Sequence, residues 1–347
     1  MPISWPFGAP AIGALLVLAS CGGRIGSDQE STPDAGAPDQ LGPDASSDEN
    51  PPDAPVSLPP PRVVLFGGFG LDNEPLNDTW IFDGATWSSV AAPSPPPARF
   101  EASMAALDAG GREEVVLFGG MVGNPGDTSD DTWLFDGTTW SQVMTATSPP
   151  ARMNASMATL GGRVVLFGGQ AGIGGAFGDT WTFDGTNWSA VTVPGPPARA
   201  FASMATLGNE VVLFGGADVT GTAIGDTWTF DGTTWSRASV TGGPPSRYNA
   251  PGATLGGAFY IFGGGAGSTT DVTGLGDTWS FDGTRWTAGN GSTPILPEAV
   301  APFGGELVGV ELVNLSCSTW TFAGTSWSEL GAAPFSARTL TTMTAWP

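Results

Sequence analysis

Histidine and lysine are absent from this chain of 347 residues, and cysteine and tyrosine occur only twice each. Without histidine, Ser-His-Asp and Cys-His nucleophile systems and His-ligated metal sites are excluded. Two cysteines are too few for a disulfide framework or a thiolate metal cage. Eleven arginines face 33 acidic residues, for a net charge of −22, so the chain lacks the basic surface that binds nucleic acid. We therefore expect no catalytic residue, no metal, no cofactor and no nucleic-acid partner.

The first residues have the pattern of a targeting signal. The apolar run at 11–18 is shorter than the ~20 residues that span a bilayer, but it has the length of a signal-peptide core. It leads into Leu18-Ala19-Ser20-Cys21, which resembles the lipobox of bacterial lipoproteins, although no basic residue precedes the run. We expect residues 1–20 to be a signal peptide and Cys21 to be acylated. The alternative is a plain secretory peptide in which Cys21 has no role.

Residues 21–61 have the composition of a disordered tether. They contain eight acidic residues, one arginine, many Pro and Ser, and no aromatic residue. Such a segment cannot bury enough apolar surface to offset the entropy of folding. We expect it to hold a globular part, residues 62–347, away from a membrane that only the lipid anchor contacts. Gly22 directly after the cysteine resembles lipoproteins sorted to the outer membrane, so an extracytoplasmic location is expected.

Tryptophan reveals an internal repeat. Twelve of the 14 Trp form six pairs, and the two members of each pair are seven residues apart. The first members follow one another at intervals of 41 to 53 residues, which is a period typical of repeat architectures. The pairs are Trp80/Trp87, Trp133/Trp140, Trp181/Trp188, Trp228/Trp235, Trp279/Trp286 and Trp320/Trp327.

Each repeat unit contains four segments with the pattern of short β-strands. An apolar run that ends in Phe-Gly-Gly, such as 163–169, is continuous and bounded by glycine, as in a strand buried on both faces. An Asp-Gly turn, such as 184–185, separates the two Trp of a pair. An Arg then opens the next run, as at 199–207. Four strands per unit without helical periodicity predict an all-β repeat fold.

This arrangement resembles the kelch repeat, whose units are about 50 residues long. The resemblance covers residues 62–347 and implies a six-bladed β-propeller. Phe-Asp-Gly replaces the aromatic-Asp-Pro of the family, and the sixth unit lacks Phe-Gly-Gly and the leading Arg and carries Ser318 for an Asp. Besides the Trp pairs, the matching residues are the Gly-Gly steps at 67–68, 119–120, 168–169, 215–216 and 263–264, and Arg99, Arg152, Arg199, Arg247 and Arg338.

The two ends of the repeat region complement each other. The segment 62–68 matches the second strand of a unit and has only the tether before it. The segment 337–344 begins with Arg338 and matches a first strand, after which the chain stops. We therefore expect blade one to combine a C-terminal first strand with N-terminal strands two to four, which leaves no open edge in the ring.

Two enzyme classes provide the alternative function. The Phe-Asp-Gly turns differ by one residue in spacing from the Asp-box of sialidases, and Trp rows can bind sugars, but burial between blades explains the twelve paired Trp. Trp346 stays unassigned. Galactose oxidase shares the kelch scaffold, yet its copper site needs His ligands that this chain lacks. A carbohydrate-active or galactose-oxidase-like enzyme therefore remains only the alternative.

The repeated Arg have two interpretations. Five guanidinium groups near one channel mouth could hold an anion or carboxylate bidentately. Alternatively, each bonds backbone carbonyls of the neighbouring blade or the repeated Asp that precedes the first Trp of a pair. The candidate residues are Arg99, Arg152, Arg199, Arg247 and Arg338.

The segments between the second and third strands vary while the strands are nearly copied, and such loops on a fixed scaffold usually carry binding specificity. Their polar candidates are Asp72, Asn73, Glu74, Asn124 and Asp127. Together with the family's usual role, these features predict a non-enzymatic, monomeric module. We expect it to bind a protein or glycan partner through these loops and the links between blades.

Overall fold

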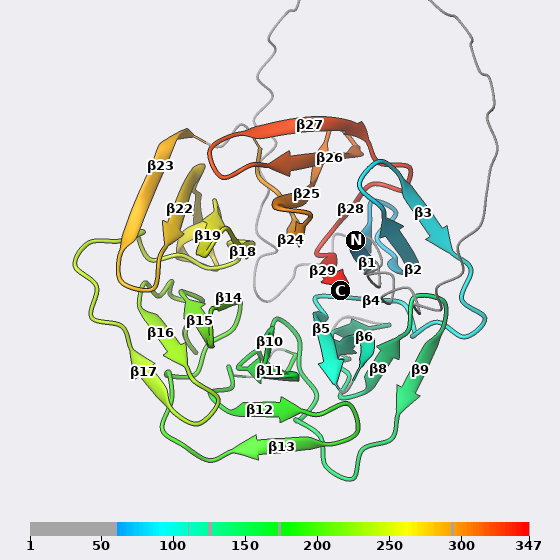
Figure 1. Cartoon of the computed structure of the whole chain (residues 1–347), viewed down its shortest axis with the longest axis horizontal. Helices are drawn as coiled ribbons and strands as arrows, with labels where there is room; N and C mark the ends of the chain where they lie inside the picture. Colours follow the sequence, from blue (N-terminus) through cyan, green and yellow to red (C-terminus); the bar gives the residue numbers. More distant parts are fainter. Residues whose placement is uncertain (1–60, 110, 124–126, 173–174, 293–294, 347) are drawn as a thin grey trace, which may run out of the picture. The chain divides into compact units, whose positions relative to one another are not determined.

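The computed structural model describes residues 61–109, 111–123, 127–172, 175–292 and 295–346. The expected signal peptide (1–20), Cys21 and the expected tether up to residue 60 lie outside the described residues. The described part is all β: six antiparallel sheets surround a central axis as the blades of a propeller (Figure 1). The predicted six-bladed β-propeller is therefore confirmed. The described residues include no helix that could span a membrane.

Each blade runs from an inner strand at the axis to an outer strand at the rim (Figure 1). From inside out, blade one consists of β29 (Thr342–Trp346), β1 (Arg62–Gly70), β2 (Pro75–Phe82) and β3 (Trp87–Val90), and blade two of β5 (Ser103–Ala109), β6 (Arg112–Phe118), β8 (Thr132–Phe135) and β9 (Trp140–Val143). Blade three consists of β10 (Ser156–Leu160), β11 (Arg163–Phe167), β12 (Thr180–Phe183) and β13 (Trp188–Val191).

The remaining blades repeat this order. Blade four consists of β14 (Ser203–Leu207), β15 (Glu210–Phe214), β16 (Thr227–Phe230) and β17 (Trp235–Arg237), and blade five of β18 (Gly252–Leu255), β19 (Ala258–Phe262), β22 (Asp277–Phe281) and β23 (Trp286–Ser292). Blade six consists of β24 (Ala299–Phe303), β25 (Glu306–Val313), β26 (Ser316–Phe322) and β27 (Trp327–Ala332). The short additional strands are β28 (Arg338–Thr339), which pairs with β1, and the two pairs β4 (Arg99–Phe100) with β7 (Met121–Val122) and β20 (Gly265–Ser268) with β21 (Asp271–Gly274).

The second strand of each blade is the buried centre of its sheet. In β11, residues 164–167 are at most 1% exposed, because neighbouring blades cover both faces of the sheet. The glycines that follow are a steric requirement. Gly119 has a φ of +68°, and a Cβ there would lie 2.4 Å from the carbonyl oxygen of Arg152 in the next blade. Phe-Gly-Gly therefore marks the point where a blade touches its neighbour.

The second Trp of each pair connects adjacent blades. Trp188 of blade three is 2% exposed and donates its indole N–H to Thr132 Oγ1 of blade two at 2.9 Å. Its ring also packs edge-on against Phe118 of blade two. Within the described residues, the same indole-to-threonine bond joins five of the six blade interfaces. The interpretation of these Trp as inter-blade packing is therefore confirmed.

The two ends of the described chain meet in blade one (Figure 1). β29 runs antiparallel to β1, with Thr344 opposite Val64, so the predicted closure is confirmed. Trp346 donates its indole N–H to the Glu113 carbonyl of blade two at 3.2 Å and packs against Phe135 of that blade. The residue that the sequence left unassigned thus fastens the last strand to the next blade.

Blade six forms all four strands despite its divergent sequence. Trp327 keeps its packing position and contacts Phe262 of blade five edge-on. Within the described residues, however, the buried indole N–H groups of Trp320 and Trp327 have no hydrogen-bond partner. Blade six therefore keeps the apolar contacts of the repeat and lacks part of its polar contacts.

Deleting residues 337–347 is expected to abolish cooperative unfolding, because the deletion removes β28 and β29 and exposes the edge of β1. Thermal unfolding followed by circular dichroism measures this effect. Ser189→Ala, at an exposed position of the outer strand β13, is the control and should keep the wild-type midpoint. An unchanged midpoint in the truncated chain would show that the ring does not need its C-terminal strand.

Candidate functional site

The five repeated Arg are buried at the starts of their blades, each with at most 1% of its surface exposed. In blade one, Nη1 and Nη2 of Arg338 donate to the two carboxylate oxygens of Asp78 at 2.6 and 2.7 Å, and Nη1 also donates to the Gly67 carbonyl. We call this bidentate contact the Arg–Asp clamp. It recurs as Arg99–Asp131, Arg152–Asp179, Arg199–Asp226 and Arg247–Asp277.

The clamp keeps its carboxylate ionised. Burial alone would raise the pKa of Asp226, but hydrogen bonds from Arg199 and from the Trp228 indole, together with the Arg charge, hold that pKa below its usual value. Each guanidinium is thus bonded to acceptors of its own blade. The bonds to the repeated Asp match the second interpretation of the Arg as structural links. Its expectation of carbonyls from the neighbouring blade is wrong, because the carbonyls that accept from Nη1 belong to glycines of the same blade. An external anion would lack the free bidentate face that the first interpretation requires.

Blade six has neither member of the clamp. The pairing of its strands places Ile295 where the other blades have Arg, and Ser318 where they have Asp. Ile295 is 1% exposed and lies in an apolar cluster with Phe262 and Trp327. Because both charged residues are replaced by uncharged ones, blade six has no unpaired buried charge at this position. Loss of only one of the two would leave the other charge buried and unpaired.

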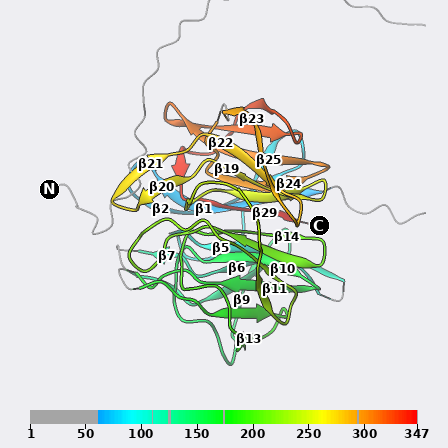
Figure 2. The same ribbon diagram turned by 90° about the vertical axis from the view of Figure 1, so that its left-hand side faces the viewer.

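The loops between second and third strands lie on the same face of the ring as the starts of the inner strands. Short backbone bridges join the two regions, for example between Arg99 and Val122 and between Tyr248 and Gly265. Figure 2 shows β7 and the β20–β21 hairpin on one side of the ring. We call this side the loop face.

The candidate binding residues that the structure describes are exposed on the loop face. Asp72, Asn73 and Glu74 form the tight turn between β1 and β2, in which the Glu74 N–H donates to Asp72 Oδ1 at 3.3 Å. Asp127 is exposed in the corresponding loop of blade two, where its carbonyl accepts the Val122 N–H. Asn124 lies outside the described residues. The side chains of Asn73, Glu74 and Asp127 are presented to solvent rather than to the scaffold.

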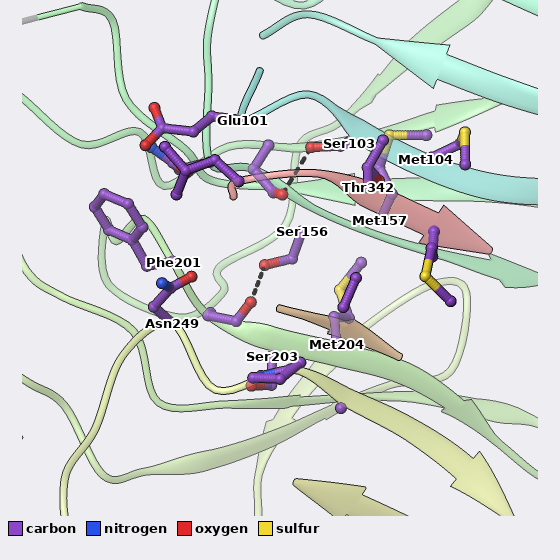
Figure 3. Close-up of a pocket in the computed structure, with 18 of the residues that line it drawn as sticks. Glu101, Ser103, Met104, Ser156, Met157, Phe201, Ser203, Met204, Asn249 and Thr342 are labelled. Carbon is purple, nitrogen blue, oxygen red and sulfur yellow. Dashed lines mark hydrogen bonds between the residues drawn. The ribbon is translucent and has the colours of Figure 1, made fainter. Parts of the chain in front are cut away.

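A pocket of about 210 Å³ lies at the propeller axis, lined by the beginnings of all six inner strands (Figure 3). Its rim contains the residue two positions after each repeated Arg. We call these residues the collar: Glu101, Asn154, Phe201, Asn249 and Leu340. Sequence reasoning missed them because their chemistry differs from blade to blade. The sequence feature that could have identified them is their spacing, since each lies two positions after a repeated Arg.

The collar backbone is strained. All five residues have φ between 52° and 60°, in the left-handed region that side chains other than Gly, Asn and Asp rarely adopt. Hydrogen bonds between blades hold them there, because a collar amide donates to the collar carbonyl of the preceding blade. The four bonds run from Asn249 to Phe201, from Phe201 to Asn154, from Asn154 to Glu101 and from Glu101 to Leu340. Such backbone strain persists only where the surroundings impose it, and it concentrates at functional sites.

Two half-buried carboxyl groups, Glu101 and Glu298, give the pocket its electrostatic character. Burial raises the pKa of each to about 7. The Asn154 amide opposes the rise at Glu101, and the Leu340 N–H, which donates to Glu298 Oε2, opposes it at Glu298. Carboxyl groups shifted by burial in a cavity are candidate functional groups. In the part of the chain that the structure describes, no cluster of His, Cys, Asp or Glu is arranged to hold a metal ion.

Comparison with known proteins reveals matches to kelch-repeat sequences. The family described as "KLHDC2/KLHL20/DRC7 Kelch-repeats domain" matches residues 56–184 and 106–298, which together exceed half of the chain. Arabidopsis thaliana has the F-box/kelch-repeat protein At1g51550, 32% identical over 127 residues (31% of this chain, 26% of that protein), and Adagio protein 3, 32% identical over 121 residues (32% and 19%). Adagio-like protein 1 of Oryza sativa subsp. japonica is 34% identical over 118 residues (31% and 18%). The chain thus spans about a quarter or less of these relatives.

The clamp is expected to behave as one coupled unit. Arg199→Ile should lower the free energy of unfolding by about 3–5 kcal/mol, because it leaves the partly buried Asp226 carboxylate without its counter-charge. Adding Asp226→Ser recreates the pair found in blade six and should restore part of that loss. Urea unfolding measures the two single variants, Arg199→Ile and Asp226→Ser, and the double variant. A double variant whose loss equals the sum of the single losses would show that the two side chains act independently.

Stability is expected to be highest on the acid side of neutrality. The raised pKa values of Glu101 and Glu298 mean that the native state binds more protons than the unfolded state between about pH 4.5 and 7, so stability falls as the pH rises through that range. The lowered pKa values of the clamp Asp residues contribute stability that is lost below their usual value of 3.8.

Denaturant unfolding at pH 4.5, 6 and 8 tests this profile. Glu101→Gln should raise stability at pH 8 by about 1–3 kcal/mol relative to its effect at pH 4.5, since each unit of pKa shift corresponds to about 1.4 kcal/mol. Glu210→Gln, at an exposed position, serves as the control for loss of one negative charge. Parallel profiles for Glu101→Gln and wild type would contradict the assignment.

Proposed function

We propose, because this chain belongs to the kelch-repeat family, that it is a non-enzymatic module that binds a protein or glycan partner on its loop face. Kelch propellers are typical protein-interaction folds. The observation that carries the proposal is the division of the molecule into a repeated scaffold and one variable face. Fold alone does not assign a function, so the proposal rests on what that face presents.

Three features of the loop face support binding. Its second-to-third-strand loops are exposed and differ between blades, while the clamps and Trp contacts beneath them repeat. Its centre is hollowed by the axial pocket. Finally, the exposed side chains of Leu71, Val219 and Leu296 lie in these loops and in the link to blade six, with exposed fractions of 47%, 64% and 53%. Apolar side chains among polar ones are typical of protein-binding surfaces.

The pocket chemistry fits binding better than glycoside hydrolysis. Hydrolysis needs one carboxyl group that stays protonated and another that stays ionised, and enzymes achieve this by moving the two pKa values apart. Here burial moves Glu101 and Glu298 in the same direction, to about 7 each. Burial alone thus does not separate the pKa values of these two groups.

The proposed location is the outside of a bacterial cell envelope. The lipobox-like Leu18-Ala19-Ser20-Cys21 and the acidic, Pro-rich segment after it support a lipid-anchored propeller held away from the membrane. Mass spectrometry of the membrane fraction tests the anchor. A mature chain that is unmodified at Cys21, or that still begins at Met1, would contradict it.

Capture of a partner from envelope extract, together with a glycan array, tests the binding proposal. A variant with Ala at Asp72, Asn73, Glu74, Asn124 and Asp127 should lose most of the captured partner, because Asp72, Asn73, Glu74 and Asp127 are exposed polar groups of the loop face. The control variant combines Asp108→Ala with Glu210→Ala. These two residues lie next to turns between an inner and a second strand, on the side of the ring away from the loop face. Equal capture by the loop variant and wild type would place the binding site elsewhere. Turnover of a glycoside or alcohol that one acidic substitution abolishes would overturn the non-enzymatic assignment.

A further inference from the structure

We propose that the axial pocket receives a basic side chain of a partner polypeptide, whose ammonium or guanidinium group binds to the carboxylates at the pocket rim, Glu101 and Glu298. The inference rests on the proposed function and names the chemistry that the loop face recognises. The pocket lies at the centre of that face and is lined by residues of every blade (Figure 3). Cations and carboxylates form the strongest class of hydrogen bonds in proteins.

The scaffold positions the two glutamates on either side of blade one. The Glu101 N–H, from blade two, donates to the Leu340 carbonyl at 3.1 Å. On the other side, the Leu340 N–H donates to Glu298 Oε2, at the start of blade six, at 3.4 Å. Leu340 of blade one therefore bonds to both residues at the pocket rim, to the Glu101 backbone through its carbonyl and to the Glu298 side chain through its amide. Their position is built into the ring rather than left to flexible loops.

Within the described residues, neither carboxylate has a cationic partner. The ion pairs of that part of the chain are the five clamps and the exposed pair Arg285–Asp282. Glu311 lies close enough to Glu298 to raise its pKa further, so the surroundings add negative charge rather than compensate it. Half-buried carboxyl groups without a counter-charge leave a place that a cation from outside the chain would stabilise.

The buried amide beside Glu101 also lacks a well-formed hydrogen bond in the part of the chain that the structure describes. Asn154 Nδ2 is buried, and it lowers the pKa of Glu101 while making no hydrogen bond of normal geometry within the described residues. Buried donors are almost always paired in folded proteins. A polypeptide ligand carries carbonyl oxygens next to every side chain, so it can supply both the cation for the carboxylates and an acceptor for this amide.

The size and shape of the pocket favour a single side chain. Its volume of about 210 Å³ is below the ~300–1,000 Å³ typical of pockets for larger small molecules. The Phe201 and Leu340 side chains belong to the same collar as Glu101, and they offer an aromatic ring and an aliphatic group to the stem of a Lys or Arg. The net charge of −22 attracts a basic partner over a longer range.

Binding of peptide pools tests the proposal. The probes are acetylated and amidated octapeptides with random uncharged flanks and one fixed central residue: Lys, Arg, norleucine or Glu. Norleucine keeps the aliphatic stem of Lys without its charge. The immobilised protein should retain the Lys and Arg pools about tenfold or more over the norleucine pool, as expected for a charge-assisted hydrogen bond. Equal retention of the Lys and norleucine pools would overturn the proposal.

Matched variants identify the groups responsible. Glu101→Gln combined with Glu298→Gln should abolish the preference for Lys and Arg, while Glu210→Gln, at the opposite face, should keep it. The wild-type preference should increase from pH 6 to pH 8, as the carboxyl groups ionise, and the double variant should show no such increase. A preference that survives in the double variant would contradict the assignment of these glutamates.

The outcome is separable from that of the loop-face experiment. If the envelope partner is captured by wild type and equally by the Glu101→Gln, Glu298→Gln variant, while the loop variant fails to capture it, the loop face binds but the pocket inference is wrong. If the basic pools are retained through the glutamates and no envelope partner is captured, the pocket inference holds without support for the wider proposal. Retention of n-butylammonium as strongly as the Lys pool would show that a free amine suffices and would overturn the polypeptide assignment.

Discussion

A buried ion pair, the Arg–Asp clamp, determines where each of five blades begins, and the binding face depends on that position. The clamp joins the start of the inner strand to the start of the third strand and to the end of the second. In blade one, Arg338 and Asp78 lie 260 positions apart in the chain, so the same contact also closes the ring. A buried ion pair is stable only when both charged groups are present. The clamp therefore determines how the strands of a blade are positioned, and it also stabilises them.

The clamp is connected to the proposed binding face because each collar residue lies two positions after a clamp Arg. Just beyond each Arg, the chain enters the left-handed conformation of the collar, and four collar amides bond from one blade to the next through blades one to five. The collar presents the side chains of different residues at equivalent positions, so chemistry can vary there without change in the fold. Glu101 and the nearby Glu298 give the pocket negative charge, while the exposed loops surround it. Recognition and architecture are thus assigned to different residues.

Most of the fold could be predicted from the sequence, because Trp pairs, Gly-Gly steps and Asp-Gly turns repeat with the chemistry that each position requires. The closure of the ring by Arg338 and the strand after it could also be predicted, because one repeat unit is divided between the two ends of the sequence. The site was less accessible. The partner of each Arg remained one of two alternatives, because the Arg–Asp pairs join residues 27 to 32 positions apart in four blades and 260 positions apart in blade one. The collar was missed because its five residues share a backbone conformation but range from Glu and Asn to Phe and Leu. Glu298 was missed because it belongs to the blade that departs most from the repeat.

Hydrogen–deuterium exchange of the protein with and without its captured partner tests most directly whether binding occurs on the face that the clamps organise. The account predicts added protection in peptides that contain the collar and the loops between second and third strands, including 71–74 and 99–102. It also predicts no change in the turns between inner and second strands, such as 207–210. Protection confined to those turns, or to the outer strands at the rim, would contradict it.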